Sequence, residues 1–444
     1  MKRIVILGGG ESGIGSAILA KIKNFDVFIS DKGKIKDEYK KILLEYNIDF
    51  EENKHTENKI LNADEIIKSP GIPDKAPVFT KIKEKGINII SEIEFAGRYC
   101  NAKKICVTGS NGKTTTATLI HFLLKNAGIN VGLAGNIGKS FAMQVATENH
   151  DYYVLELSSF QLDGMFEFKA DIAVLLNITP DHLDRYDYKL ENYARSKFRI
   201  IQNMSDDDCF IFCADDKITM EHIEKIVSKA KMLPFSQRTN VEQGSHVEDN
   251  SLYAKVNTGT FSILVDDLSL KGRHNIYNSM AAAITGKVLD IKNEIIRQSL
   301  STFKGVEHRL EFVLSMGGIK FINDSKATNV NSVWYALDSI NGKIIWIAGG
   351  TDKGNDYSEI IDLVKEKVRA IVCLGVDNSK IISFFKDAVP IITETHSAKD
   401  AVEKSYELAY AGDTVLLSPA CASFDLFENY EDRGRQFKQA VRNL

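Results

Sequence analysis

The sequence has little of what marks a disulfide-stapled, fibrous or membrane-spanning protein. Its 444 residues include only 6 cysteines, 7 prolines and 2 tryptophans. The cysteines form no paired CxxC set, which argues against a disulfide framework and favours a reduced, cytoplasmic protein. The scarcity of proline excludes long proline-rich linkers. No apolar run approaches the ~20 residues that a membrane helix needs, so we expect no membrane insertion.

An excess of charge of one sign is also missing. The chain has 56 Lys and Arg against 60 Asp and Glu, a formal net charge of −4. Without a basic block there is no general attraction to nucleic acid or to an anionic membrane, and we expect neither as a partner. Any phosphate must therefore be recognised by local loops.

Strand-like apolar runs alternate with helical stretches along the whole chain. At about 150 residues per domain, this length suggests about three domains. The alternation is typical of parallel α/β sheets. We predict an α/β fold with three nucleotide-fold-like domains over residues 1–94, 95–304 and 305–444, and a turn-rich β excursion from about 235 to 270. The expected strands are Arg3 to Leu7, Asp26 to Ser30, Ile105 to Thr108, Tyr152 to Glu156, Ile172 to Asn177, Lys343 to Ala348, Ala370 to Leu374 and Thr414 to Leu417.

The clearest chemical motif is a glycine-rich turn between an apolar strand and a helix-compatible run. It reads Thr108-Gly109-Ser110-Asn111-Gly112-Lys113-Thr114-Thr115. Backbone N–H groups at such a turn point at a phosphate, the lysine neutralises phosphate oxygens, and the threonine after it suits Mg²⁺. The standard GxxxxGK[ST] spacing is not met, because position 107 is valine. The strand-turn-helix context still favours a nucleotide phosphate loop.

Two further strand ends carry polar groups in the same region. Glu156 ends an apolar strand, a position where a carboxylate suits nucleotide-bound Mg²⁺. His182 follows the strand that we expect to end at Asn177, and Lys197 follows on a predicted helix. Because the carboxyl ends of parallel strands meet at one crevice, we expect these groups to converge with the Gly109 loop.

The third region has two loops suited to anions. The run from Phe321 to Asn329 places a carboxylate, a cation and two hydroxyls after a short strand, and Gly349 to Gly354 follows another strand. His308 and Arg309 stand at the entrance of this region. Together these residues indicate a surface for ATP or for a carboxylate.

The N-terminal motif has two explanations. Gly8, Gly10 and Gly13 match GxGxxG, and Asp31 closes the second strand about where a ribose-binding acid lies in dinucleotide folds. A nicotinamide-dependent oxidoreductase has this pattern. A uridine nucleotide or another diphosphate explains it at least as well, because a dehydrogenase needs no second phosphate loop.

With these motifs the chain resembles the Mur ligases, ATP-dependent amide-forming enzymes of peptidoglycan synthesis. The Thr108 to Thr114 turn looks like their shared ATP loop, which accounts for its spacing. Other shared signatures are Gly272 to Asn275 with Asn278, and His308-Arg309. Five runs resemble the branch that joins D-glutamate to UDP-N-acetylmuramoyl-L-alanine: Ser69 to Pro73, Glu156 to Leu162, Asn177 to Arg185, Asn323 to Asn329 and Leu417 to Phe424.

The resemblance implies a Rossmann-like N-terminal domain for the UDP group, a central P-loop-type ATPase domain and a Rossmann-like C-terminal domain for the amino acid. It implies ATP and two Mg²⁺ ions as cofactors, with UDP-N-acetylmuramoyl-L-alanine and D-glutamate as partners. A monomer is the expected state. ATP would phosphorylate the L-alanyl carboxylate, and the amine of D-glutamate would attack the resulting acyl phosphate.

The implied site residues fall into sets that match the family motifs. The catalytic set is Lys113, His182, Lys197 and Arg309. ATP would contact Gly109, Asn111, Gly112, Lys113, Thr114, Thr115, Asn275, Asn278, His308, Arg309 and Asp324. The metal ligands would be Thr114, Glu156, His182 and Lys197, the last of which this family typically carries as a carbamate. The UDP substrate would contact Ser12, Asp31, Ser69 and Asn136. D-glutamate would contact Lys326, Thr328, Lys353, Ser423, Phe424 and Tyr430, the last standing where an aromatic residue, often Phe, is expected.

Three competing interpretations predict different behaviour. A ligase for another amino acid, such as the L-alanine-adding enzyme or a folylpolyglutamate synthase, would not account for the runs Glu156 to Leu162 and Ser418 to Phe424. An oxidoreductase built on Gly8 to Gly15 would release no phosphate from ATP. A non-catalytic nucleotide-binding regulator would have no need of the complete set of Lys113, Glu156, His182 and Lys197.

Overall fold

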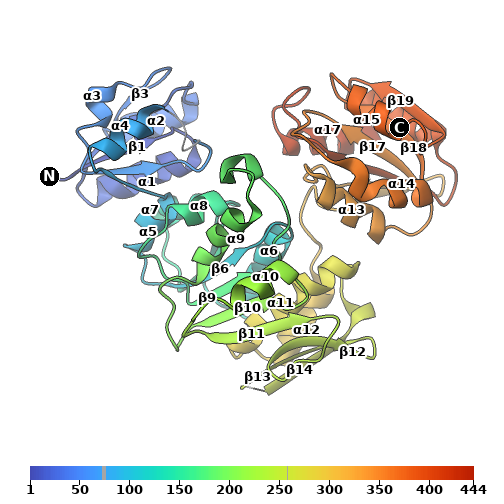
Figure 1. Ribbon diagram of the computed structural model, residues 1–444, viewed down its shortest axis with the longest axis horizontal. Coiled ribbons are helices and arrows are strands. Elements are labelled where there is room, and N and C mark those ends of the chain that lie inside the picture. Colours follow the sequence, from blue (N-terminus) through green and yellow to red (C-terminus); the bar gives the residue numbers. More distant parts are fainter. Residues whose placement is uncertain (73–76, 258) are drawn as a thin grey trace. The chain divides into compact units, whose positions relative to one another are not determined.

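The computed structural model describes residues 1–72, 77–257 and 259–444 (Figure 1). Pro73, the last residue of the Ser69 to Pro73 run, lies outside these ranges. Within them the chain forms two compact units, one of Met1–Ser269 with Ile276–Phe303 and the other of Leu270–Asn275 with Lys304–Leu444. The first unit holds two β-sheets and the second holds one. The predicted α/β class with three sheet-containing domains is confirmed.

The N-terminal sheet is parallel throughout, with the strand order β3-β2-β1-β4-β5. Its strands are rich in Ile and Val, and they contribute to hydrophobic clusters on both faces of the sheet. Strands that are buried on both faces have this composition. The order reverses between β1 and β4, the switch point at which ligands bind in sheets of this kind. The strands are β1 (Arg3–Leu7), β2 (Asp26–Ser30), β3 (Asp49–Glu51), β4 (Glu65–Lys68) and β5 (Asn88–Ile90), and the helices are α1 (Glu11–Ile22), α2 (Asp37–Glu45), α3 (Glu57–Ile60) and α4 (Pro77–Glu84).

The central sheet has nine strands in the order β14-β13-β12-β11-β10-β9-β6-β8-β7. Pairing is parallel from β7 to β12 and antiparallel from β12 to β14, where the predicted β excursion lies. The strands are β6 (Lys103–Thr108), β7 (Val131–Gly135), β8 (Tyr152–Glu156), β9 (Ile172–Leu175), β10 (Cys209–Cys213), β11 (Lys231–Ser236), β12 (Gly244–Glu248), β13 (Ser251–Val256) and β14 (Gly259–Leu264). The α-helices that accompany it are α6 (Lys113–Asn126), α7 (Phe141–Thr147), α8 (Ser159–Asp163), α9 (Leu190–Phe198), α10 (Lys217–Ile223), α11 (Arg273–Val288) and α12 (Asn293–Thr302).

The third sheet has the order β15-β16-β20-β17-β18-β19 and is parallel except for the edge strand β15. Two hydrophobic clusters cover its two faces, one of them built around the buried Trp346. The strands are β15 (Glu311–Met316), β16 (Ile319–Asn323), β17 (Ile344–Gly349), β18 (Val368–Leu374), β19 (Ile391–Thr395) and β20 (Thr414–Ala420). The α-helices are α13 (Val330–Ser339), α14 (Ile361–Lys367), α15 (Ser379–Phe385), α16 (Ala398–Leu408) and α17 (Tyr430–Arg442).

Helix α5 (Glu92–Gly97) joins the two sheets of the first unit. It contains residue 94, where the sequence predicted the first domain to end. Glu92 is buried and accepts hydrogen bonds from Ser140 Oγ (2.6 Å) and Ala142 N (2.9 Å), at the start of α7. Helices α1 and α7 also pack against each other. The N-terminal and central sheets are therefore held together by a buried carboxyl group and a helix pair.

The expected strands agree with the structure, with one correction. β1, β2 and β8 coincide with the prediction, whereas β9 ends at Leu175, two residues before the expected Asn177. Asn177 leaves the sheet because it bonds to the glycine-rich loop. Its Oδ1 accepts from Asn111 N (2.9 Å), and its Nδ2 donates to Asn111 O (3.1 Å).

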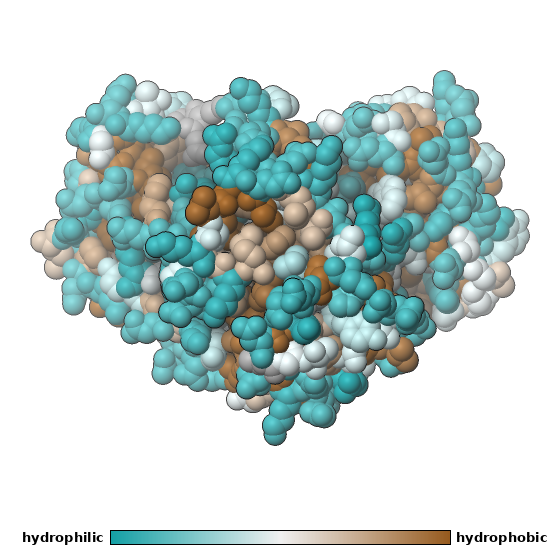
Figure 2. Space-filling model, turned by 60° about the horizontal axis from the view of Figure 1, so that its bottom comes forward, coloured by the Kyte–Doolittle hydropathy of each residue, from teal (hydrophilic) through white to brown (hydrophobic). Residues whose placement is uncertain are grey.

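Polar side chains cover most of the face shown in Figure 2, with small apolar areas between them. Within the described part of the chain, none of the helices combines the length and apolar character needed to cross a membrane.

Candidate active site

The glycine-rich turn predicted from the sequence lies at the carboxyl edge of the central sheet, between β6 and α6. Gly109 and Gly112 have φ values of 153° and 85°, in the region that favours glycine. A Cβ atom at position 112 would lie 2.5 Å from Asn278 Oδ1. Both glycines are therefore required by the backbone path of the loop, as a phosphate loop demands.

Lys113 begins α6 and folds back over this loop. Its Nζ donates to the carbonyl oxygens of Gly109 and Ser110, both at 2.8 Å. Thr114 and Thr115 follow in the first turn and are buried. The Thr115 hydroxyl has no hydrogen-bond partner among the described residues. The helix N-terminus thus offers backbone N–H groups, a cation and two hydroxyls to an anion.

Glu156 ends β8 beside this loop and is only 1% exposed. Its Oε1 accepts a hydrogen bond from Asn136 Nδ2 (2.8 Å). Its Oε2 is buried and has no hydrogen-bond partner in the described part of the chain. A buried carboxylate oxygen left unpaired is costly unless something else binds it, and Mg²⁺ prefers such oxygens. The residues present therefore fit a metal ion at this position.

Lys197, on α9, is buried and belongs to the same cluster. It is 1% exposed, and its Nζ donates to Gly109 O (2.7 Å) and lies 4.6 Å from the centre of the Tyr193 ring. Burial, followed by the nearby charge of Lys113, holds the pKa of Lys197 well below its usual value. A neutral amine is the form that reacts with CO₂, so this environment suits the expected carbamate.

His182 does not lie at a strand end, contrary to the expectation. It precedes a short 3₁₀ helix (Leu183–Tyr186), has a φ of 51°, and its side chain is 44% exposed. Its ring packs edge-on against Phe160 at 5.3 Å, and its Nε2 lies 3.7 Å from Asp181 Oδ1. β9 ends at Leu175, so His182 lies seven residues beyond the end of its strand.

The N-terminal sheet has its own pocket, and small-molecule sites typically have volumes of about 300 to 1,000 Å³. This one measures about 730 Å³ and is lined by Gly8, Asp31, Lys32, Asn53, Lys54, His55, Glu57, Gly71, Ile72, Pro77 and Val78. Asp31 accepts hydrogen bonds from Gly9 N (2.6 Å) and Gly33 N (2.7 Å), so it shapes the loops around the pocket.

Three other positions predicted for the UDP substrate lie in this unit. Ser69 stands against the first turn, since a Cβ atom at Gly8 would lie 2.5 Å from Ser69 Oγ. Ser12 is in the first turn of α1. Asn136 lies beside Glu156 instead of the pocket. Sequence reasoning missed Asn53, Lys54 and His55, because no motif distinguishes this stretch from an ordinary polar loop.

In the second unit, a buried cluster surrounds Asp324, which follows β16. Its Oδ2 accepts from Ser418 Oγ (2.8 Å) and its Oδ1 from Leu310 N (3.2 Å). Burial raises the pKa of Asp324 to about 7, although the nearby Arg309 opposes the shift. Arg309 Nε is buried without a hydrogen-bond partner among the described residues.

His308 is buried in the same unit, with its Nδ1 2.9 Å from Asn323 Nδ2. Burial lowers its pKa. Of the two asparagines expected at the ATP site, Asn275 belongs to the second unit and donates through Nδ2 to Lys271 O (2.8 Å). Asn278 belongs to the first unit and accepts from Thr116 Oγ1 (3.1 Å).

The positions expected for D-glutamate vary in exposure. Lys326 Nζ lies 5.3 Å from the centre of the Tyr430 ring. Ser423 is buried, Thr328 is half-buried, and Lys353 is exposed. Phe424 is 73% exposed. Tyr430 begins α17, and the other side chains come from loops that follow β16, β17 and β20, three neighbouring parallel strands of the third sheet.

Sequence reasoning missed Arg433, which organises these loops. It is buried on α17 and donates to Ser325 Oγ (3.0 Å), Ser325 O (2.8 Å) and Cys421 O (3.2 Å). Its partners lie 12 and 108 residues away, so no local pattern distinguishes it from the other charged residues of this helix.

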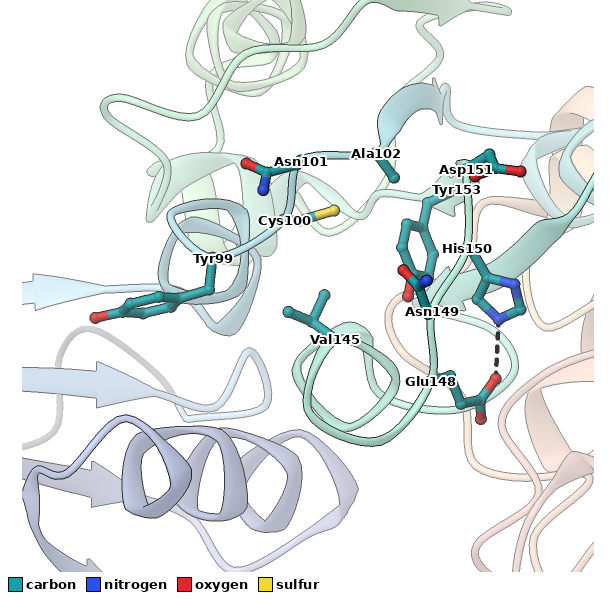
Figure 3. Close-up of a pocket in the computed structure, with 10 residues that line it drawn as sticks. All are labelled: Tyr99, Cys100, Asn101, Ala102, Val145, Glu148, Asn149, His150, Asp151 and Tyr153. Carbon is teal, nitrogen blue, oxygen red and sulfur yellow. Dashed lines mark hydrogen bonds and ion pairs between the residues drawn. The ribbon is translucent and has the colours of Figure 1, made fainter.

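A different kind of pocket lies at the amino edge of the central sheet (Figure 3). It has a volume of about 340 Å³ and is lined by Tyr99, Cys100, Asn101, Ala102, Val145, Glu148, Asn149, His150, Asp151 and Tyr153. These residues precede or begin β6 and β8, whereas the glycine-rich loop and Glu156 follow the same two strands. None of the predicted site residues lies in this pocket.

Comparison with known proteins agrees with the motifs. Three family descriptions match the chain: "MurD N-terminal domain" over residues 3–78, "Mur ligase middle domain" over residues 107–286 and "Mur ligase, glutamate ligase domain" over residues 308–421. The chain is also 57% identical to a UDP-N-acetylmuramoylalanine--D-glutamate ligase from Christiangramia forsetii, over 100% of both chains. It belongs to the Mur ligase family. The match over residues 3–78 removes the oxidoreductase interpretation of the GxGxxG turn.

Other curated relatives and solved structures extend this finding. Ligases of the same name from Bacteroides fragilis and Chloroherpeton thalassium are 57% and 41% identical to this Mur ligase, over 100% of this chain and 100% and 98% of theirs. The structure of UDP-N-acetylmuramate-alanine ligase MurC from Thermotoga maritima matches with a TM-score of 0.63 at 18% identity, over 100% of this chain and 99% of that one. Escherichia coli FolC matches with a TM-score of 0.59 at 16% identity, over 79% and 92%. These two structures show the shared fold.

Proposed function

We propose that this Mur ligase joins D-glutamate to UDP-N-acetylmuramoyl-L-alanine, converting ATP to ADP and phosphate. The observation that carries the proposal is the cluster at the carboxyl edge of the central sheet. There the Gly109 loop, Lys113, Lys197 and the unpaired oxygen of Glu156 form a site for a nucleotide phosphate with a metal ion. The relatives of this name, 41% to 57% identical over nearly their full length, support the choice of substrates.

The reaction must make a poor electrophile reactive. An L-alanyl carboxylate oxygen attacks the γ-phosphorus of ATP, ADP leaves, and an acyl phosphate forms. The amine of D-glutamate then attacks the acyl carbon, phosphate leaves with the C–O bond electrons, and the amine loses a proton. Lys113 and Arg309 would offset the charge of the anionic groups, mainly by positioning them.

The proposed metal sites would use three buried residues and one exposed histidine. Thr114 and Glu156 would hold one Mg²⁺, and His182 with Lys197 as a carbamate would hold a second. The ions would neutralise phosphate charge. His182 is half-exposed and not held by a strand, so we expect the second site to form as the substrate orders that loop.

Each sheet-containing region would then take one ligand. The domains over 1–94, 95–304 and 305–444 would bind the UDP group, ATP with metal, and D-glutamate. Ser12, Asp31 and Ser69 would contact the UDP part, and Asn136 the muramoyl part. Asn275, Asn278, His308 and Asp324 would contact ATP, and Lys326, Thr328, Lys353, Ser423, Phe424 and Tyr430 would surround D-glutamate. We expect a monomer acting in the cytoplasm.

Phosphate release from ATP tests this function directly. With UDP-N-acetylmuramoyl-L-alanine present, D-glutamate is compared with L-glutamate, L-alanine and meso-diaminopimelate. Release should depend on D-glutamate and on Mg²⁺. No release with D-glutamate would contradict the proposal, and release with another amino acid would assign the chain to a different branch of the family.

A further inference from the structure

A chain of hydrogen bonds beside the N-terminal pocket begins at Glu51, the last residue of β3. Its carboxylate accepts from Thr56 N (2.7 Å), Thr56 Oγ1 (2.6 Å) and Ser30 Oγ (2.7 Å). Burial works against ionisation, but the hydrogen bonds from Thr56 and Ser30 bring the pKa of Glu51 below its usual value. An ionised carboxylate only accepts hydrogen bonds, so all three contacts are donated to Glu51.

The next link fixes the tautomer of His55. The Ser30 hydroxyl has one hydrogen, which it donates in the hydrogen bond to Glu51. Ser30 Oγ also lies 2.7 Å from His55 Nδ1, so in this contact Ser30 accepts and Nδ1 carries the hydrogen. Ser30 is fully buried, which leaves no water to change the arrangement. Burial also lowers the pKa of His55, despite the charges of Asp31 and Glu51, which favours the neutral ring.

A neutral ring with hydrogen on Nδ1 has a lone pair on Nε2. His55 lines the 730 Å³ pocket together with Gly8, Asp31 and Gly71, which follow β1, β2 and β4 at the switch point of the sheet. No described residue forms a hydrogen bond or ion pair with Nε2. The pocket wall therefore presents a hydrogen-bond acceptor of fixed position.

We propose that His55 distinguishes uracil from cytosine in the nucleotide of the UDP substrate, with Nε2 accepting a hydrogen bond from N3–H of uracil. This inference rests on the proposed function. Uracil carries a hydrogen on N3, whereas cytosine has a lone pair there. Cytosine would place two acceptors against each other.

The Ser30–Glu51 pair opposes the change of tautomer by which a neutral His55 could donate to cytosine. If the hydrogen moved from Nδ1 to Nε2, the lone pair on Nδ1 would face Ser30 Oγ at 2.7 Å. Ser30 cannot turn its hydrogen toward Nδ1 without abandoning Glu51. His55 is thus the specificity-determining residue, and Ser30 and Glu51 position its hydrogen.

Calorimetric titration of the full-length protein with UDP and with CDP tests this proposal. The wild type should prefer UDP by on the order of 10- to 100-fold, the loss expected when one buried acceptor is left unpaired. His55→Phe should reduce the preference to about 3-fold or less, mainly by weakening UDP binding. Ser30→Ala frees the tautomer, so CDP should bind more tightly while UDP binding changes little. A merely structural defect would weaken both nucleotides.

A probe that needs no substitution provides the second measurement. In N3-methyluridine diphosphate a methyl group replaces the N3 hydrogen, which removes the donor and leaves O2 and O4 as acceptors. It should bind the wild type about 10-fold more weakly than UDP, and bind His55→Phe as well as UDP does. An equal loss of both nucleotides in His55→Phe, or an unchanged preference in Ser30→Ala, would overturn the role of His55. Failure of UDP to bind the wild type would instead overturn the proposed function.

Discussion

The two edges of the central sheet are built from the same strands but treat charge in opposite ways. At the carboxyl edge, Glu156 Oε2 and the Thr115 hydroxyl lack partners in the described chain, and the buried Lys197 amine donates to a carbonyl oxygen and lies over the Tyr193 ring. At the amino edge, His150 lies between Asn130 Oδ1 (2.7 Å) and Glu148 Oε2 (2.9 Å).

The charges of the amino edge are therefore satisfied within the protein. Glu148 contacts both His150 and Lys139, which lies 3.2 Å away. The carboxyl edge leaves Glu156 Oε2 and the Thr115 hydroxyl without partners among the described residues, at a cost in stability that a bound ligand would recover. The comparison teaches that a pocket alone does not identify an active site. Unpaired buried groups gathered beside a phosphate loop are the stronger indication.

The largest expected effect is at the phosphate loop. Lys113→Ala should lower kcat by about 100-fold or more, the usual loss when one charge-stabilising contact is removed from a buried site. Phosphate release at saturating substrates measures it. Lys103→Ala, at the opposite end of β6, is the matched control and should leave kcat unchanged. A similar loss of kcat in both variants would show that the two edges of the central sheet do not differ in their role in catalysis.

The second effect concerns the metal. Glu156→Gln should raise the Mg²⁺ concentration needed for half-maximal activity by about 10- to 100-fold, because the amide offers a weaker ligand than the carboxylate. A Mg²⁺ titration of activity measures the change. Glu148→Gln is the control at the amino edge. If the Mg²⁺ curve of Glu156→Gln matched the wild type, the unpaired oxygen would not be a metal ligand.

A third effect extends the comparison to the carboxyl edge of the third sheet. Lys353→Ala should raise the KM for D-glutamate by about 10-fold or more, the loss of one charged hydrogen bond, and leave the KM for the UDP substrate unchanged. Steady-state kinetics with each substrate varied separate the two values. Lys365→Ala, on α14, is the control. Equal increases in both KM values would contradict the assignment of one ligand to each region.

The smallest effect is expected at the amino edge itself. His150→Gln should lower the free energy of unfolding by less than about 1 kcal/mol, as is usual for partly exposed ion pairs, with no change in kcat. Urea denaturation and phosphate release measure the two quantities. A large fall in kcat with unchanged stability would show that this edge acts on catalysis.

Several site features could be predicted from the sequence because they are local. Apolar runs predicted β6 and β8, and the two glycines predicted the turn between β6 and α6. Glu156 was predicted to lie near this turn because it is the last residue of its strand. The family motifs added positions in the third sheet. His182 lies farther from a strand end than expected, because β9 ends at Leu175 and Asn177 bonds to the loop instead.

Sequence by itself determined the alternation of strands and helices, the phosphate loop and the family, since each depends on residues a few positions apart. Only the tertiary structure decided which buried groups have partners. Glu156 meets Asn136 across 20 residues, His55 meets Ser30 across 25, and Arg433 meets Ser325 across 108. The physical reason is that a local pattern specifies an element, whereas the protonation and pairing of a side chain depend on what packing brings to it.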